Sequence, residues 1–182
     1  GYVKTMTMAS VNWLFDTEPD PKTGNRPIPV PRGRVLGGSS SINGLVYVRG
    51  QARDYDDWAQ MGNRGWSYED VLPYFRKAEH REGGGDPAFR GESGPLNIAD
   101  VCETDSLLDT LIEAAGELGY PLNPDYNGAS QEGFGYFQTT MKNGRRLSTA
   151  RAYLYPVEKR PNLSVELAAH TTKVLFEGTR AV

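Results

Sequence analysis

The chain has 182 residues, a formal net charge of −3 and a pI near 5.5, which argue against nucleic acid or an anionic membrane as its partner. No apolar run approaches the ~18 residues that a membrane-spanning helix needs. The single cysteine, Cys102, can form neither an internal disulfide nor a multi-cysteine metal site and is interpreted as a small filler. Only 38% of the residues are hydrophobic, and the 21 glycines and 12 prolines indicate a loop-rich part of a larger protein. The location in the cell stays open, with a cytoplasmic one favoured.

The N-terminal stretch, residues 1–31, is predicted to be an extended approach with little regular structure. An apolar run at Val11–Phe15 suggests a short strand. Continuous helix is excluded by five prolines: Pro19, Pro21, Pro27, Pro29 and Pro31.

Two helices are predicted in the next third of the chain. The first covers Ala52–Met61 and ends at Gly62. The second begins after Ser67, a favourable N-cap residue. Because proline lacks the amide that helix hydrogen bonding requires, Pro73 should kink this helix or start a new one.

The clearest helical pattern covers Thr104–Leu118, followed by Gly119 as a terminating residue and by Pro121. Its apolar positions recur at helical spacing and predict core packing: Leu107, Leu108, Leu111, Ala115 and Leu118. The stripe is therefore interpreted as structural and not as a ligand site.

The C-terminal part mixes strand and helix patterns. Gly133–Thr140 predicts a strand, and Ser148–Tyr155 a short capped helix stopped by Pro156. Leu163–Ala168 and Thr172–Glu177 predict two further strands. The mixture predicts a mixed α/β (α+β) fold whose sheet is incomplete.

The most informative motif is the segment Arg32–Asn43, R-G-R-V-L-G-G-S-S-S-I-N, called here the glycine turn. Gly37 and Gly38 allow the backbone to turn sharply or to approach a ligand closely. Three hydroxyl residues follow where a helix could start: Ser39, Ser40 and Ser41. Successive amides at such a turn can bind a phosphate, and the alternative is a Gly-Ser turn that only caps a helix.

The flanks of the glycine turn favour the first interpretation. Pro31–Trp58 closely resembles the first signature of the glucose–methanol–choline (GMC) family of FAD-dependent oxidoreductases. The resemblance extends over nearly the whole chain, through Gly65–Phe75, Gly94–Leu96, Asn127–Gly133, Ser148–Leu154 and Pro161–Val165. It implies that residues 1–62 are part of an FAD-binding domain and that residues 63–155 are substrate-domain or insertion elements. Residues 156–182 would return to the FAD-binding domain and end within it.

The resemblance also implies positions for the cofactor. Val35 and the run Asn43, Gly44, Leu45 and Val46 should line the flavin. The backbone of the turn should face the cofactor at Gly37, Gly38, Ser39 and Ser40. The alternative for Asn43 is a helix-capping role.

Two further positions bear on the cofactor. The Thr171 backbone should meet the adenine, with a solvent-facing strand residue as the alternative. Ile42 occupies a position where some family members carry a histidine bonded covalently to flavin. Isoleucine has no nucleophile, so noncovalent FAD is expected.

The function implied is oxidation of a primary alcohol to an aldehyde by hydride transfer to flavin, in a dehydrogenase or oxidase of the choline dehydrogenase type. The alternatives are an FAD-bearing hydroxynitrile lyase relative and a catalytically silent fragment. The dinucleotide fingerprint and the catalytic His pair are expected outside this chain, since neither His80 nor His170 has the family's catalytic context. The isolated segment is therefore expected to be inactive, and the alcohol and the electron acceptor stay open.

Other charged groups receive no catalytic assignment. The acidic group Asp54, Asp56 and Asp57 lies early in a predicted helix, where a solvated or packing role is favoured over metal binding. No metal site is predicted. A set of arginines near turns could hold an anion but is left unassigned: Arg145, Arg146 and Arg151.

Overall fold

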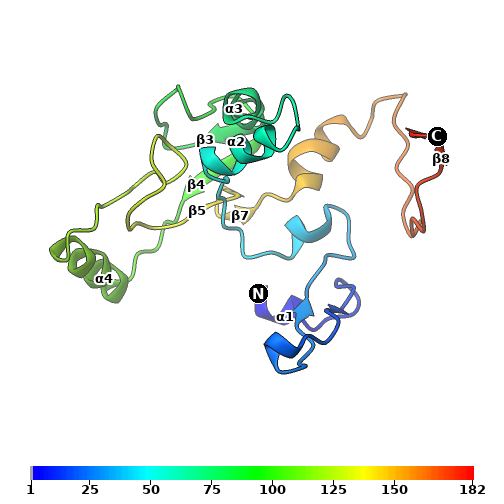
Figure 1. Cartoon of the computed structure of the whole chain (residues 1–182). Helices are drawn as coiled ribbons and strands as arrows, with labels where there is room; N and C mark the ends of the chain where they lie inside the picture. The colour runs from blue at the N-terminus through cyan, green and yellow to red at the C-terminus, as the bar shows by residue number, and fades with distance from the viewer. Residues whose placement is uncertain (1) are drawn as a thin grey trace.

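A computed structural model describes residues 2–182 as an open arrangement of short elements (Figure 1). The α-helices are α1 (Tyr2–Thr5), α2 (Ala52–Gln60), α3 (Tyr68–Ala78) and α4 (Ser106–Glu117). Shorter helical turns are η1 (Pro21–Thr23), η2 (Gly38–Ser41), η3 (Ala150–Leu154) and η4 (Tyr155–Val157). The strands are β1 (Phe15–Asp16), β2 (Pro29–Val30), β3 (Glu79–Arg81), β4 (Leu96–Asp100), β5 (Gln138–Thr139), β6 (Met141–Lys142), β7 (Arg145–Arg146), β8 (Phe176–Glu177) and β9 (Arg180–Ala181).

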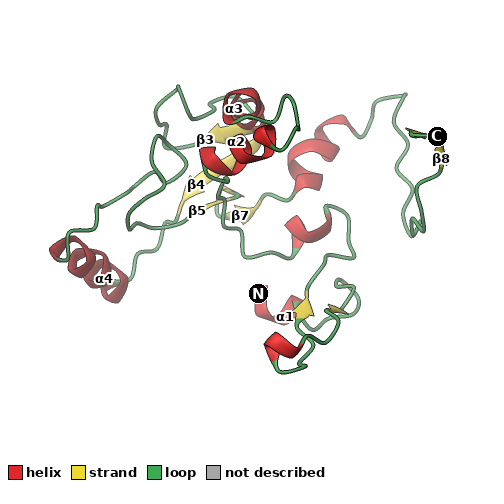
Figure 2. Ribbon diagram, viewed as in Figure 1, coloured by secondary structure: helices red, strands yellow, loops and turns green. Residues whose placement is uncertain are grey.

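The strands form small separate sheets, so the prediction of a mixed α/β chain with incomplete sheets is confirmed (Figure 2). In the central sheet, β3 runs parallel to β4 with Glu79 opposite Leu96, and β4 runs antiparallel to β5 with Ala99 opposite Thr139. The pairs β1–β2, β6–β7 and β8–β9 are isolated antiparallel ribbons.

Helices α2 and α3 form where predicted, and side chains fix their first turns. Ser67 accepts a hydrogen bond from the Asp70 amide at 3.3 Å, and the Asp70 carboxylate accepts one from the Ser67 amide at 3.2 Å, which completes a capping box. Pro73 lies inside α3, which continues through it, so the expectation of a new helix start is wrong. Packing of α3 against α2, with the rings of Tyr55 and Phe75 5.6 Å apart, offsets the one amide hydrogen bond that proline removes.

Helix α4 is also present, but its apolar stripe is not a core. Its N-cap is Asp105, whose carboxylate accepts the Leu107 amide at 2.9 Å. Ala115 is 6% exposed, whereas Leu107 and Leu118 are 75% and 79% exposed. In Figure 1, α4 projects from one side of the molecule, and Leu108 and Leu111 are also 46% and 56% exposed. The prediction of core packing for this stripe is therefore wrong within residues 2–182.

Predicted strands are shorter than expected because a strand needs a hydrogen-bonded neighbour. Val11–Phe15 contributes only its last residue to β1, and Gly133–Thr140 contributes only β5. Leu163–Ala168 forms no strand, and Thr172–Glu177 pairs only in β8. Ser148–Tyr155 is helical as the π-helix η3, but Pro156 does not stop it, since the turn η4 includes this proline.

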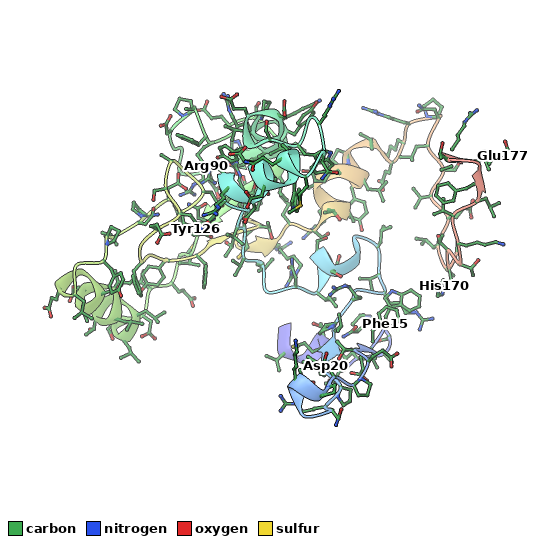
Figure 3. The ribbon with its side chains drawn as sticks, viewed as in Figure 1. Phe15, Asp20, Arg90, Tyr126, His170 and Glu177 are labelled. Carbon is green, nitrogen blue, oxygen red and sulfur yellow. The ribbon has the colours of Figure 1, made fainter. Side chains whose placement is uncertain are left out.

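The buried interior is small and largely polar. The chain exposes 13,478 Å², whereas a compact protein of this mass, 20.1 kDa, would expose about 8,700 Å². Buried polar residues include Arg49, Glu79 and Arg90. Figure 3 shows Arg90 and Tyr126 in the central part of the molecule, with His170 and Glu177 on the C-terminal arm.

Candidate cofactor site

The glycine turn has backbone geometry that requires glycine at two adjacent positions. Gly37 and Gly38 have φ angles of 86° and 56°, in the left-handed region that side chains disfavour. The 3₁₀ turn η2 begins directly after Gly37. A turn that leads into a helix start was predicted here, and the structure confirms it, although the helix is a single 3₁₀ turn.

The space around these glycines differs from one to the next. A Cβ atom on Gly33 would lie 2.2 Å from the Gly38 carbonyl oxygen, so the backbone at Gly33 packs directly against the backbone at Gly38. A Cβ on Gly37 would lie 2.7 Å from the Ser41 hydroxyl. A Cβ on Gly38 would meet no atom within 4 Å. The face of the turn at Gly38 is therefore open.

The serine hydroxyls of the turn bind the turn itself. Ser40 Oγ donates to the Gly37 carbonyl at 2.5 Å, and Ser41 Oγ donates to the Leu36 carbonyl at 2.8 Å. Ser39 Oγ accepts the Gly33 amide at 3.1 Å. Because Ser40 and Ser41 donate their hydroxyl protons within the turn, a ligand there would meet mainly backbone and the Ser39 hydroxyl.

A second segment, more than 100 residues further along the chain, holds the turn from outside. The Thr149 amide donates to Ser40 Oγ at 2.9 Å, and Thr149 Oγ1 donates to the Gly37 carbonyl at 3.2 Å. Arg146, in β7, donates to the carbonyl oxygens of Ser40 at 3.1 Å and of Asn43 at 2.7 Å. Sequence reasoning left Arg146 unassigned and missed Thr149. The signal available was that both lie in or beside the Ser148–Leu154 motif.

Asn43 orders the residues that follow it and caps no helix. Its side-chain oxygen accepts the Leu45 amide at 3.1 Å. Leu45 has a φ of 70°, which is uncommon for a branched side chain and marks a constrained segment. The helix-capping alternative for Asn43 is therefore wrong. Val46 is half-exposed beside Gly44, where an added Cβ would meet nothing within 4 Å.

A groove of about 570 Å³ runs along the other flank of the turn. Val35 and Leu36 line one side of it, and the stretch 166–170 lines the other. The ring of Trp13 lies edge-on to His170 at 4.8 Å and beneath the Arg34 guanidinium at 4.9 Å. Thr171 follows this stretch directly, in an exposed loop and not in a strand.

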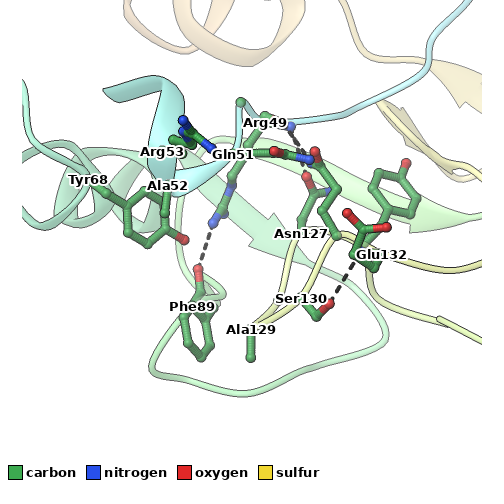
Figure 4. Close-up of a pocket in the computed structure, with 14 residues that line it drawn as sticks. Arg49, Gln51, Ala52, Arg53, Tyr68, Phe89, Asn127, Ala129, Ser130 and Glu132 are labelled. Atoms are coloured by element: carbon green, nitrogen blue, oxygen red, sulfur yellow. Dashed lines mark hydrogen bonds between the residues drawn. The ribbon is translucent and has the colours of Figure 1, made fainter. Parts of the chain in front are cut away.

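Arg49 and Asn127 line a pocket between the start of α2 and the loop after Tyr126 (Figure 4), and both also belong to a polar cluster of hydrogen-bonded side chains. We define it as the side chains of Arg49, Glu79, Arg90, Asp125, Asn127 and Gln138. Glu79 bonds Arg49 at 2.6 Å and Arg90 at 2.7 Å, and all three side chains are at most 3% exposed. Burial raises the pKa of the Glu79 carboxyl, but the hydrogen bond from Arg90 and the charges of Arg49 and Arg90 outweigh it, so the pKa lies below its usual value.

The polar cluster positions the chain that follows the glycine turn. Asn127 Oδ1 accepts the Arg49 amide at 2.9 Å, and Gln131 Nε2 donates to the Arg49 carbonyl at 2.9 Å. The Tyr126 hydroxyl donates to the Tyr47 carbonyl at 2.7 Å. The Tyr47 hydroxyl accepts a hydrogen bond from Arg49 Nε at 3.3 Å. Burial raises the pKa of the Tyr47 and Tyr126 hydroxyls, so both stay protonated.

The remaining candidates do not gather at the turn. His80 Nδ1 bonds the Glu92 carbonyl, far along the chain from His170. Asp56 accepts the Tyr68 amide at 2.9 Å, which supports the packing interpretation of the acidic group. Among residues 2–182, no cluster of three or more His, Cys, Asp or Glu side chains could hold a metal, and Cys102 is exposed. No helix within that range is long and apolar enough to cross a bilayer.

The site is thus an open glycine turn with apolar flanks, held in place by a distant segment of the chain. The whole described chain matches one family. The chain belongs to the GMC oxidoreductase family, whose model matches residues 2–182. Among individual proteins, it is 50% identical over 177 residues to the oxygen-dependent choline dehydrogenase of Brucella anthropi, covering 97% of this chain and 32% of that protein. The chain thus spans about a third of the length of such relatives.

Solved structures agree with this family. Pyridoxine 4-oxidase from Mesorbium loti superposes with a TM-score of 0.85 at 31% identity, covering 94% of this chain and 34% of that one. An FAD-dependent oxidoreductase from Chaetomium thermophilum gives the same TM-score and identity, covering 94% of this chain and 32% of that one.

Proposed function

We propose that this chain holds part of the flavin site of an FAD-dependent oxidoreductase that oxidises a primary alcohol to an aldehyde. The observation that carries the proposal is the glycine turn, which is open at Gly38 while the Ser40 and Ser41 hydroxyls donate to carbonyls of the turn. Such a turn accommodates a cofactor that approaches backbone closely. Bound flavin would supply the hydride acceptor.

The residues of this chain fit that cofactor in the following roles. The backbone of Gly37, Gly38, Ser39 and Ser40 would face it, and the exposed side chains of Val35 and Val46 would give apolar contact to a flat ring. Asn43, Gly44 and Leu45 would continue the lining. Thr171 would meet the adenine. This placement is supported by the groove at Val35, whose other side is formed by residues 166–170, directly before Thr171.

The same groove supports the proposed division of the chain. Residues 1–62 and 156–182 would belong to one FAD-binding unit, because Trp13 and Val35 share a groove with His170. Residues 63–155 would be substrate-domain elements, and they contain β3, β4 and α4.

FAD is proposed to be noncovalent. Ile42 is 6% exposed and has no nucleophilic atom, so it can pack beneath the turn but cannot bond to a flavin. Acid denaturation of the full-length flavoprotein should release all flavin into the supernatant. Flavin that stays on the precipitated protein would contradict this part of the proposal.

The central test compares two glycines in the full-length protein. Gly38 and Gly24 both have a left-handed φ, and an added Cβ meets nothing within 4 Å at either position. Gly38→Val should lose FAD because its side chain enters the cofactor site, whereas Gly24→Val should keep FAD and suffer only the similar backbone strain. Flavin per folded molecule and melting temperature measure the two effects. Equal flavin content in both variants would overturn the proposal.

We also propose that the 182-residue chain alone does not turn over alcohols. His80 is engaged by Glu92 and His170 packs against Trp13, so neither is paired for acid–base work at the turn. Dye-reduction assays with choline, aryl alcohols and aliphatic alcohols should give background rates. Clear turnover by the pure chain would contradict this.

A further inference from the structure

We propose that Arg146 is a positioning residue of the flavin site, which fixes the Asn43 carboxamide so that its amino group is left to donate to the cofactor. The inference rests on the proposed function and adds to it a residue outside the glycine turn. The evidence for it is the set of contacts made by the Arg146 guanidinium and the hydrogen bonds accepted by the Asn43 carboxamide.

The guanidinium of Arg146 donates hydrogen bonds to three oxygens at the end of the glycine turn. Its Nη1 donates to the Ser40 carbonyl at 3.1 Å and to Asn43 Oδ1 at 2.7 Å, while its Nη2 donates to the Asn43 carbonyl at 2.7 Å. The two nitrogens therefore hold both the backbone and the side chain of Asn43. A planar fork can do this because its donors are fixed relative to one another.

These contacts determine which way the Asn43 amide points. Asn43 Oδ1 accepts from two groups that can only donate, the Arg146 guanidinium and the Leu45 amide at 3.1 Å. Exchanging the oxygen and nitrogen would place donor against donor at both contacts. The amide nitrogen of Asn43 then has no hydrogen-bond partner among the described residues, and it lies in the segment proposed to line the flavin.

The same contacts secure a strained backbone. Leu45 holds a φ of 70°, and its amide is fixed by Asn43 Oδ1. A non-glycine residue stays in this region only when its surroundings over-determine it. Arg146 therefore acts on Leu45 and Val46 through Asn43, since its side-chain hydrogen bonds go to Ser40 and Asn43.

Arg146 makes no ion pair within residues 2–182, and its three acceptors are neutral. Its geometry and its charge are thus separable by experiment. Lysine keeps the charge but offers a single nitrogen, which cannot reach three oxygens with the same geometry.

The test uses the full-length protein with Arg146→Lys, Arg146→Gln and the control Arg145→Gln. Arg145 is the neighbouring residue of β7, is exposed, and has no side-chain hydrogen bond among the described residues. FAD titration of the apoprotein gives the dissociation constant, and the visible absorption spectrum reports the polarity around the bound flavin. Both Arg146 variants should raise the dissociation constant about tenfold and shift the flavin bands, while Arg145→Gln should match the wild type.

A double mutant separates positioning from general stability. In an Asn43→Ala background the Arg146→Lys change should cost much less FAD affinity than in the wild type, since the group it acts through is gone. Full additivity, or an Arg146→Lys protein with wild-type affinity and spectrum, would overturn the inference. These comparisons do not depend on Arg146→Gln folding. A wild-type protein that binds no FAD would instead refute the proposed function itself.

Discussion

The polar cluster around Glu79 and the helix α4 are organised in opposite ways. The polar cluster buries charged side chains, with Glu79 held by Arg49 and Arg90, and it joins segments from residue 49 to residue 138. Helix α4 has a well-formed leucine stripe that lies in solvent. The order at the centre of this chain thus comes from directional polar contacts, and apolar patterning alone does not bury a helix face.

The largest effect should come from removing the carboxylate at the centre of the polar cluster. Glu79→Ala leaves Arg49 and Arg90 buried without their partner, which should cost about 3–5 kcal/mol of unfolding free energy. Leu118→Ala, at the C-cap of α4, should cost less than about 0.5 kcal/mol because the side chain is already exposed. Urea unfolding of the full-length protein measures both. Comparable losses in the two variants would remove the contrast between these regions.

Acid should weaken the polar cluster in a defined direction. The pKa of Glu79 is lowered in the folded protein, since Arg90 and Arg49 outweigh the effect of its burial. The Glu79 carboxylate therefore stabilises the fold fully at pH values above its pKa in the unfolded chain, about 4.3. This stabilisation is lost as the pH falls through its lower pKa in the folded protein. The stability difference between wild type and Glu79→Gln should be constant around neutral pH and shrink in strong acid. A difference that grows on acidification would show the opposite sign of pKa shift.

Local sequence chemistry was enough to predict those elements whose stability is local. Ser67 as the N-cap of α3, and Gly62 after α2, set helix ends through neighbouring residues, and these predictions are confirmed. The glycine turn was found for the same reason, because its two left-handed residues are adjacent glycines.

What could not be predicted depends on contacts between distant segments. Strand β5 is only two residues long because its neighbour β4 pairs with it over that length. Arg146 and Thr149 meet the turn across more than 100 residues, so no local pattern reveals their partners. The exposure of the α4 leucine stripe depends on which other elements pack against it. The helical spacing of the leucines carries no information about those elements.

Two glycine substitutions should change stability with opposite signs. At Gly33 an added Cβ lies 2.2 Å from the Gly38 carbonyl oxygen, so Gly33→Ala should force the glycine turn apart and cost about 1–3 kcal/mol. At Gly116, inside α4, an added Cβ meets nothing within 4 Å, so Gly116→Ala should gain up to about 1 kcal/mol through helix propensity. Thermal melting of both variants measures the signs. A neutral Gly33→Ala would mean that the turn has more room than its closely packed backbone indicates.

The smallest effect should come from an ion pair outside the polar cluster. Arg53 and Asp57 lie one turn apart on α2 with 3.8 Å between Nε and Oδ2, and the Arg53 side chain is 86% exposed. Water screens such a pair, so Arg53→Gln should change the unfolding free energy by only about 0.2–0.5 kcal/mol, and added salt should reduce even that. Arg49→Gln is the matched substitution four residues earlier, where the guanidinium lies 2.6 Å from a fully buried carboxylate. Its cost should be several times larger and nearly independent of salt. Similar losses for Arg53→Gln and Arg49→Gln would show that burial does not set the strength of these pairs.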